Sequence, residues 1–203
     1  MGTNYQTVLL AAEYPAVERA VAELRAEVLV APVGAQRWAV IPRDRGDDAS
    51  RAEVLGRQLS WRARCPALAF QVDSEVMLAQ VFRNGRQNHE YVSDVAKLVE
   101  WSQDADGQFV RRIDGVVIAP EAPTPAGPSG ADPEPFVPFG AGRVDPELLA
   151  GVLRGPAPHG SAPEQHVAIL RALHLEPYPL TRGFHDPGLN QVPGVRYLTG
   201  QPG

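Results

Sequence analysis

Cysteine is almost missing from this chain of 203 residues, since Cys65 is the only one. A single thiol cannot close a disulfide within the chain, so the composition does not call for an oxidising compartment. The N-terminal residues also lack the positive region and apolar run of a secretory signal, and no stretch approaches the roughly 18 unbroken apolar residues of a membrane span. We therefore expect a cytoplasmic protein that is neither exported nor embedded in a membrane.

Dense basic clusters are lacking as well. Lysine and arginine total 19 against 24 acidic residues, which gives a net charge of -5, and basic residues gather at most in pairs such as Arg111 and Arg112. Binding to a nucleic-acid backbone requires concentrated positive charge, so the sequence predicts no nucleic-acid partner. The 20 prolines and 19 glycines, with arginine far more frequent than lysine, are typical of a GC-rich bacterial genome.

Motifs for phosphate binding and nucleophilic catalysis are missing. The chain contains no P-loop, no G-x-G-x-x-G and no G-x-S-x-G. Cys65 stands before Pro66 with no family signature around it, which indicates an inert, partly buried thiol. Asp104 and Asp106 resemble the start of an EF-hand loop, but Gly115 stands where that loop needs a glutamate. The sequence predicts no bound cofactor.

Regular secondary structure is well marked in the first hundred residues. Hydrophobic residues make up 44% of the chain, enough for a buried core, and short apolar runs alternate with segments of helical periodicity. Asn84-Gly85 favours a two-residue type I′ turn, because both central residues of that turn need a positive φ. The patterns predict strands at residues 7–12, 27–33, 37–41, 67–72, 76–82 and 87–92, and helices at 15–25 and 50–62.

This order of elements predicts an α+β fold. We expect a mixed or antiparallel sheet with helices on one face, in the split βαβ or ferredoxin-like manner, with an added hairpin. A short helix is predicted around Val95–Trp101, and a strand pair at residues 109–118 is predicted to break at Asp114-Gly115. The sheet domain is expected to cover residues 1–118.

The rest of the chain has a different composition. Residues 120–142 contain seven prolines and four glycines, so we interpret residues 119–143 as a linker or long exposed loop. Helix starts at Asp145-Pro146-Glu147 and at Ser161 with Glu164 predict a small helical hairpin within residues 144–203. Such a hairpin cannot bury a core alone and is expected to dock on the first domain. Residues 195–199 fit a last strand.

The return strand of the predicted hairpin has the densest polar chemistry. Because alternate residues of a strand face opposite sides, His89 and Tyr91 are expected to share a face with Gln87, while Asn88 and Glu90 occupy the other. The strand could recognise a small ligand or a partner. It could equally be a solvated edge strand whose polar residues prevent aggregation.

Four histidines lie in the last third of the chain. His166 and His174 are eight residues apart on one predicted helix, which leaves them roughly 80° apart around its axis, unlike the i, i+4 pairs that share a metal. One hypothesis is a composite metal site. The alternative is that these histidines lie on the surface and at helix ends. The candidate ligands are His159, His166, His174 and His185.

Three classes of function fit these observations. The acidic charge, the docked helical hairpin and the missing catalytic motifs favour a non-enzymatic interaction or accessory factor (immunity-like, adaptor or pathway-associated) of a bacterial cytoplasm, with another protein as its partner. The second class is a small-molecule-binding protein or enzyme with a pocket between the sheet and the C-terminal segment. The third is a metal-dependent hydrolase using the C-terminal histidines. Candidate acid–base residues for the second class are His89, Glu90, Tyr91 and His185.

Overall fold

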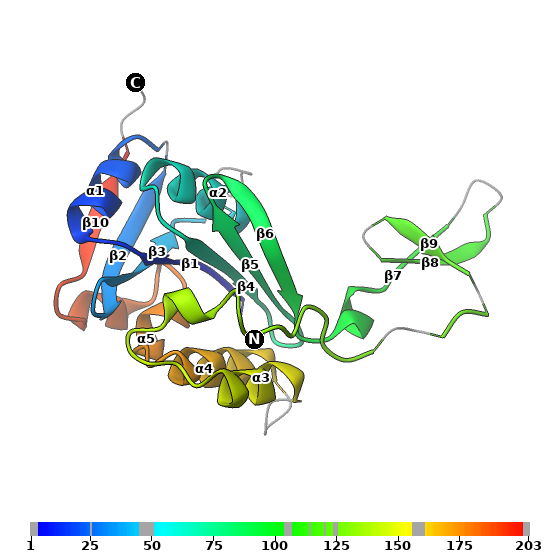
Figure 1. The fold of residues 1–203 in the computed structure, drawn as a ribbon. Helices are drawn as coiled ribbons and strands as arrows, with labels where there is room; N and C mark the ends of the chain where they lie inside the picture. Colours follow the sequence, from blue (N-terminus) through cyan, green and yellow to red (C-terminus); the bar gives the residue numbers. More distant parts are fainter. Residues whose placement is uncertain are drawn as a thin grey trace.

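The structure is a computed structural model with a mixed α+β fold (Figure 1). It describes residues 4–24, 26–44, 51–103, 107–113, 115–119, 121–123, 126–155 and 161–200. The strands are β1 (Tyr5–Ala11), β2 (Glu27–Gly34), β3 (Arg37–Pro42), β4 (Ala67–Val72), β5 (Met77–Arg83), β6 (Arg86–Val92), β7 (Glu100–Gln103), β8 (Phe109–Ile113), β9 (Val116–Ile118) and β10 (Arg196–Thr199). The α-helices are α1 (Tyr14–Ala22), α2 (Ala52–Arg62), α3 (Pro146–Arg154), α4 (Ala162–Ala172) and α5 (Pro177–Leu180). The 3-10 helices are η2 (Val95–Leu98), η3 (Val137–Phe139) and η4 (Pro187–Gln191).

None of the helices within these described ranges is long and apolar enough to cross a lipid bilayer. The predicted start of α2 at Ser50 lies outside the described residues, and the structure places Arg51 immediately before the helix. The six strands predicted for the first hundred residues each begin and end within two residues of an observed strand.

Seven strands form one antiparallel sheet in the order β10-β2-β3-β1-β4-β5-β6 (Figure 1). The strand nearest the C-terminus, β10, pairs with β2, so the first and the last strand of the described chain belong to the same sheet. β6 forms the opposite edge, beside β5. The strands β4 and β5 therefore lie between β1 and the predicted site on β6.

Helices cover both faces of this sheet, which is why β1 is apolar on both sides. Val8 and Leu10 pack with α1 and α2, while Leu9 between them packs with the C-terminal helices. The expectation of helices on one face therefore holds for α1 and α2 alone. On the other face α3, α4 and α5 bury a second set of aliphatic side chains: Leu149, Leu153, Ile169, Leu170 and Leu180.

The proline- and glycine-rich segment contributes to this second core. Phe136 and Phe139 are fully buried in it. Arg37 of β3 donates hydrogen bonds to three successive carbonyls of the segment, Pro138 O at 3.0 Å, Phe139 O at 2.9 Å and Gly140 O at 2.7 Å. When the segment packs on the sheet, these three carbonyls lose their hydrogen bonds with water, and the bonds from Arg37 replace them.

The predicted hairpin is present between β5 and β6. Asn84 and Gly85 have φ angles of 51° and 75°, as a two-residue type I′ turn requires. Arg83 pairs with Arg86 across the turn. The register then shifts. Val81 and Phe82 are adjacent in β5, but they pair with His89 and Gln87, so Asn88 is an extra residue that forms a β-bulge in β6.

The bulge changes which side chains share a face. Gln87 lies with Glu90, whose Oε2 accepts hydrogen bonds from Gln87 Nε2 at 3.0 Å and from Gln80 Nε2 at 2.8 Å. His89 and Tyr91 occupy the other face. The prediction that Gln87 shares a face with His89 and Tyr91 is therefore wrong, because the extra residue Asn88 reverses the alternation.

Strands β7, β8 and β9 form a separate three-stranded sheet that projects away from the large sheet as an arm (Figure 1). The predicted helix at Val95–Trp101 is only partly correct, because η2 ends at Leu98 and Trp101 lies in β7. The strand pair at residues 109–118 is present as β8 and β9.

The hairpin turn can be tested with two glycines. Gly85→Ala should lower the free energy of unfolding by about 1–2 kcal/mol, because φ is 75° and the new Cβ would lie 3.3 Å from Trp61 Cβ. Gly151→Ala is the matched control, since it lies inside α3 with nothing within 4 Å of an added Cβ, and should raise stability by about 0.5–1 kcal/mol. Urea denaturation followed by circular dichroism measures both. Equal effects of the two substitutions would contradict the turn geometry.

Candidate functional site

Tyr91 connects the edge strand β6 to the C-terminal helices. Its side chain is fully buried, and its hydroxyl donates to Leu153 O at 3.1 Å and accepts from Gln165 Nε2 at 2.5 Å. Burial raises the pKa of Tyr91 above its ordinary value, so the phenol stays protonated at neutral pH. Tyr91 therefore links β6 to α3 and α4 through hydrogen bonds, and its buried hydroxyl is not accessible to a ligand as an acid or base.

His89 and Glu90 face opposite sides of the sheet. His89 Nε2 donates to Gly130 O at 2.8 Å, and its ring stands edge-on to Phe136 with centroids 5.7 Å apart. Glu90 is exposed on the other face, where it binds the two glutamine amides. The structure therefore does not bring His89, Glu90 and Tyr91 together into one acid–base site.

His185 lies at a different place, in a cavity of about 380 Å³ bordered by the start of β1 and the end of β3. Tyr5, Gln6 and Asp186 also line this cavity. The His185 ring is edge-on to Phe184, with centroids 5.2 Å apart. Because β4 and β5 separate β1 from β6, His185 does not share a site with the hairpin residues.

The candidate metal ligands occupy separate environments. His166 is buried within the core, and His174 lies just beyond α4 with φ 57° and its Nε2 donating to Arg143 O at 3.1 Å. His185 lines the cavity described above, and His159 lies outside the described residues. Within the part of the chain that the structure describes, no three His, Cys, Asp or Glu residues are grouped as a metal site.

His166 is the most perturbed histidine. Tyr5 donates a hydrogen bond to its Nδ1 at 2.9 Å, and the ring of Phe70 packs at a centroid distance of 4.2 Å. Nε2 has no hydrogen-bond partner among the described residues, an arrangement that costs about 1–3 kcal/mol for a buried group. Full burial lowers the pKa of His166 to about 3, so the ring is neutral at physiological pH.

Cys65 follows α2 and is partly buried. Burial raises the pKa of its thiol to about 11, so the nucleophilic thiolate is scarce at neutral pH. This agrees with an inert thiol.

The arm presents an apolar face. The register places Trp101 directly opposite Arg111 and places Arg111 opposite Ile118, so these side chains point the same way. Trp101 and Phe109 remain 68% and 71% exposed, and Val116 remains 69% exposed. We call this surface the arm face, formed by Trp101, Phe109, Arg111, Ile113, Val116 and Ile118.

A hollow of about 440 Å³ lies at the arm face. It is bordered by Trp101, Phe109 and Ile118 from the arm and by Ala96 and Val99 at η2. On the same face, Arg111 donates from one of its terminal nitrogens to Ala119 O at 3.0 Å and to Ala122 O at 2.9 Å, which holds the chain that follows β9.

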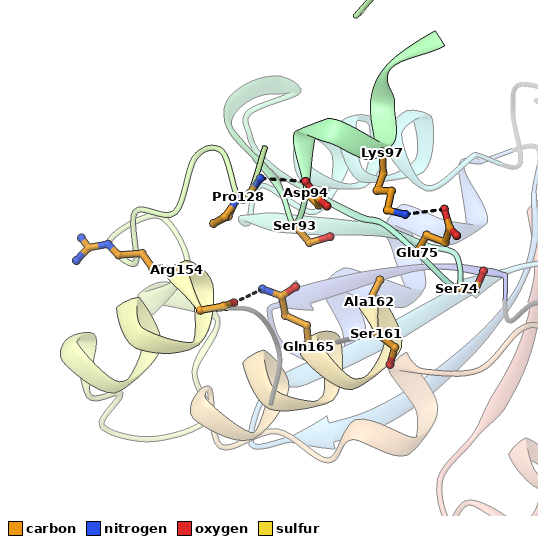
Figure 2. A pocket seen from close by; sticks show the side chains of 12 residues that line it. Ser74, Glu75, Ser93, Asp94, Lys97, Pro128, Arg154, Ser161, Ala162 and Gln165 are labelled. Atoms are coloured by element: carbon orange, nitrogen blue, oxygen red, sulfur yellow. Dashed lines mark hydrogen bonds and ion pairs between the residues drawn. The ribbon is translucent and has the colours of Figure 1, made fainter. Parts of the chain in front are cut away.

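A polar cavity of about 400 Å³ lies between the ends of β4–β6 and the C-terminal helices (Figure 2). One wall comes from the residues after β6, including Asp94 and Lys97, and the other from the start of α4, including Gln165. Gln165 is the residue that sequence patterns missed, since nothing marks an internal glutamine of a helix as a buried group. We call this site the polar cavity; its lining is Ser74, Glu75, Ser93, Asp94, Lys97, Gly127, Pro128, Arg154, Gly155, Ser161, Ala162 and Gln165.

Comparison of the chain with protein-family models, with curated proteins and with solved structures found no significant match. Inference about function therefore depends on the chemistry of the chain's own residues.

The low pKa of His166 predicts a pH dependence of stability. An unfolded chain protonates this histidine near pH 6.5, while the folded chain does so only near pH 3. Between these values the unfolded state binds the additional proton, so the free energy of unfolding should fall as the pH is lowered below about 6.5, by up to roughly 1.4 kcal/mol per pH unit. Denaturant titrations at a series of pH values measure this slope.

His166→Gln should remove that contribution, because the glutamine amide oxygen can still accept the bond from Tyr5 and does not titrate. His185→Gln is the control for the same substitution at an exposed position outside the core. A wild-type slope that persists in His166→Gln would show that other groups cause it.

Proposed function

We propose that this protein is a non-enzymatic interaction factor, of the adaptor, immunity-like or accessory type, which binds another protein through the arm face. The observation that carries the proposal is the exposure of Trp101, Phe109 and Val116 together on one face of a projecting sheet. Single exposed apolar residues are ordinary, whereas a contiguous apolar patch with aromatic residues is typical of binding surfaces.

The residue types on the arm face support this assignment. Aromatic residues and arginine are enriched at the centres of protein interfaces, where a few of them contribute most of the binding energy. Trp101 on β7 and Arg111 on β8 are cross-strand neighbours on this face, and Phe109 lies on the same face two residues before Arg111. The arm face thus combines an apolar contact area with an arginine whose guanidinium is held by the carbonyls of Ala119 and Ala122.

We take the partner to be a different protein, with an apolar patch that covers Trp101, Phe109 and Val116. A second copy of this chain would meet the arm face with its own arm face. The experiment below distinguishes these two occupants.

Side-chain contacts rather than strand addition would provide the recognition. The outer strands of the arm are β7, with four residues, and β9, with three. Such short edges offer few backbone groups to an added strand. The exposed side chains of the arm face offer far more contact area.

We also infer that β1–α1–β2–β3–α2–β4 forms a split βαβ core of the ferredoxin-like type, with a C-terminal helical hairpin docked on it. The support for this is the strand order β2-β3-β1-β4 with antiparallel neighbours and with α1 and α2 on one face. α3 and α4 contact each other and pack on the other face. Such a core would hold the arm on a rigid base.

Two tryptophans make a matched test of the arm face. Trp101→Ser should abolish partner binding or weaken it by about 2 kcal/mol or more, as is typical for a central aromatic of an interface. Trp61→Ser is the control, because Trp61 is 64% exposed on α2, which packs on strands β4 and β5 of the large sheet. Both substitutions should leave stability within about 0.5 kcal/mol, since both side chains are exposed.

The partner is found by photo-crosslinking in cells from benzoylphenylalanine placed at position 116 or position 61. We expect one heteromeric product from position 116 that is lost in Phe109→Ser, and no equivalent product from position 61. Affinities of the identified protein for the wild type and the two tryptophan variants are then measured by calorimetry. A product that contains only a second copy of this chain, or equal binding by Trp101→Ser and the wild type, would overturn the proposal.

A further inference from the structure

We propose that the polar cavity binds a small zwitterionic molecule of the α-amino-acid class. The first observation is a hydrogen-bond acceptor at the end of a largely buried side chain. Gln165 is only 4% exposed, and its Nε2 donates to Tyr91 Oη at 2.5 Å and to Gly155 O at 3.4 Å. Its Oε1 has no hydrogen-bond partner among the described residues and points into the cavity (Figure 2).

The orientation of this amide is determined by its neighbours. The Tyr91 hydroxyl gives its proton to Leu153 O, so it can only accept from Gln165. The NH₂ group of Gln165 must therefore face Tyr91, and the carbonyl oxygen must face the cavity. A ligand that supplies an N–H or O–H donor would satisfy this oxygen.

Asp94 supplies negative charge on the facing wall. Its Oδ1 accepts hydrogen bonds from the backbone N–H groups of Ala96 and Gly127, both at 3.0 Å, which holds the carboxylate in place. Its other oxygen, Oδ2, makes no hydrogen bond within the described ranges and is available to a ligand. Asp94 and Gln165 Oε1 together suit a protonated amino group, which has three donors.

Lys97 supplies positive charge on the same wall as Asp94 (Figure 2). It is the only lysine in the sequence. Its Nζ lies 3.3 Å from Glu75 Oε2, and both side chains are substantially exposed, so this ion pair is weak and can be exchanged for a ligand carboxylate. The first turn of α4, at Ser161 and Ala162, also lines the cavity and favours negative charge.

The remaining lining excludes other common ligands. No aromatic ring is among the cavity's described lining residues, so a nucleobase or a sugar ring would find nothing to stack on. The carboxylates of Glu75 and Asp94 outnumber the ammonium of Lys97, because the Arg154 side chain extends away from the cavity (Figure 2), and this disfavours a phosphate or another anion without a positive group. A volume of about 400 Å³ is near the lower end for small-molecule sites. A zwitterion matches the size and the presence of both signs of charge.

The binding arrangement follows from these positions. The ligand's ammonium group donates to Gln165 Oε1 and to the Asp94 carboxylate. Its carboxylate accepts from Lys97 Nζ. The serines of the lining, Ser74, Ser93 and Ser161, border the space left for the side chain of the ligand.

The single lysine allows a direct test. Reductive methylation with ¹³C-formaldehyde labels Lys97 and the N-terminal amine while keeping their charges. Each proteinogenic L-amino acid is then titrated while the two signals are followed by NMR. We expect at least one amino acid to shift the Lys97 signal saturably, with a Kd below about 1 mM, and calorimetry on unlabelled protein to give the same Kd.

Variants and analogues locate the site. Lys97→Gln and Asp94→Asn should each weaken binding by about tenfold or more, the effect of losing one charged hydrogen bond. Asp94→Asn retains the oxygen that caps η2, so it should stay folded. Arg83→Gln, at the end of β5 outside the cavity lining, should bind like the wild type. The matching carboxylic acid without an amino group should bind at least about tenfold more weakly.

Three results would overturn the proposal. The first is that no amino acid shifts the Lys97 signal at about 10 mM, well above any specific Kd. The second is that the analogue without an amino group binds as tightly as the amino acid. The third is that Lys97→Gln and Asp94→Asn bind like the wild type.

Discussion

The buried hydrogen-bond chain from Gln165 through Tyr91 to Leu153 is the interaction on which the candidate sites depend most. It joins the edge strand β6 to α4 and α3 at one point in the core. Through it, β6 is hydrogen-bonded to the α4 wall of the polar cavity. The same bonds orient the Gln165 amide, so the contact that joins β6 to the C-terminal helices also directs Gln165 Oε1 toward the cavity.

Local sequence signals were sufficient for most of the main elements. The strands of the large sheet are short apolar runs bounded by turns, and Asn84-Gly85 has the positive φ angles that the turn type demands. Both faces of β1 are apolar because helices from two distant parts of the chain cover them. The apolar run predicts that β1 is buried, and the C-terminal hairpin is expected to dock on the first domain. The pattern does not reveal that this hairpin covers the second face of the sheet.

The candidate site was less predictable because it depends on one extra residue and on distant contacts. Periodicity assigns His89, Glu90 and Tyr91 to alternating faces, and only the bulge at Asn88 moves Gln87 beside Glu90. No local pattern distinguishes Tyr91, which is fully buried, from His89, which bonds Gly130 near the surface. Trp101 was assigned to a helix because its spacing fitted one, whereas pairing with β8 decides its strand conformation.

The arm face and the polar cavity meet at η2. Lys97 lines the polar cavity, while Ala96 and Val99 border the hollow at the arm face, so a single turn of chain contributes to both. Asp94 caps this turn and also accepts a hydrogen bond from the backbone N–H of Gly127, which lines the cavity beside it. If an amino acid bound at Lys97 changes the affinity of the arm face for its partner, linkage requires that the partner change the amino-acid affinity by the same factor. The common turn is the physical element through which such coupling would pass.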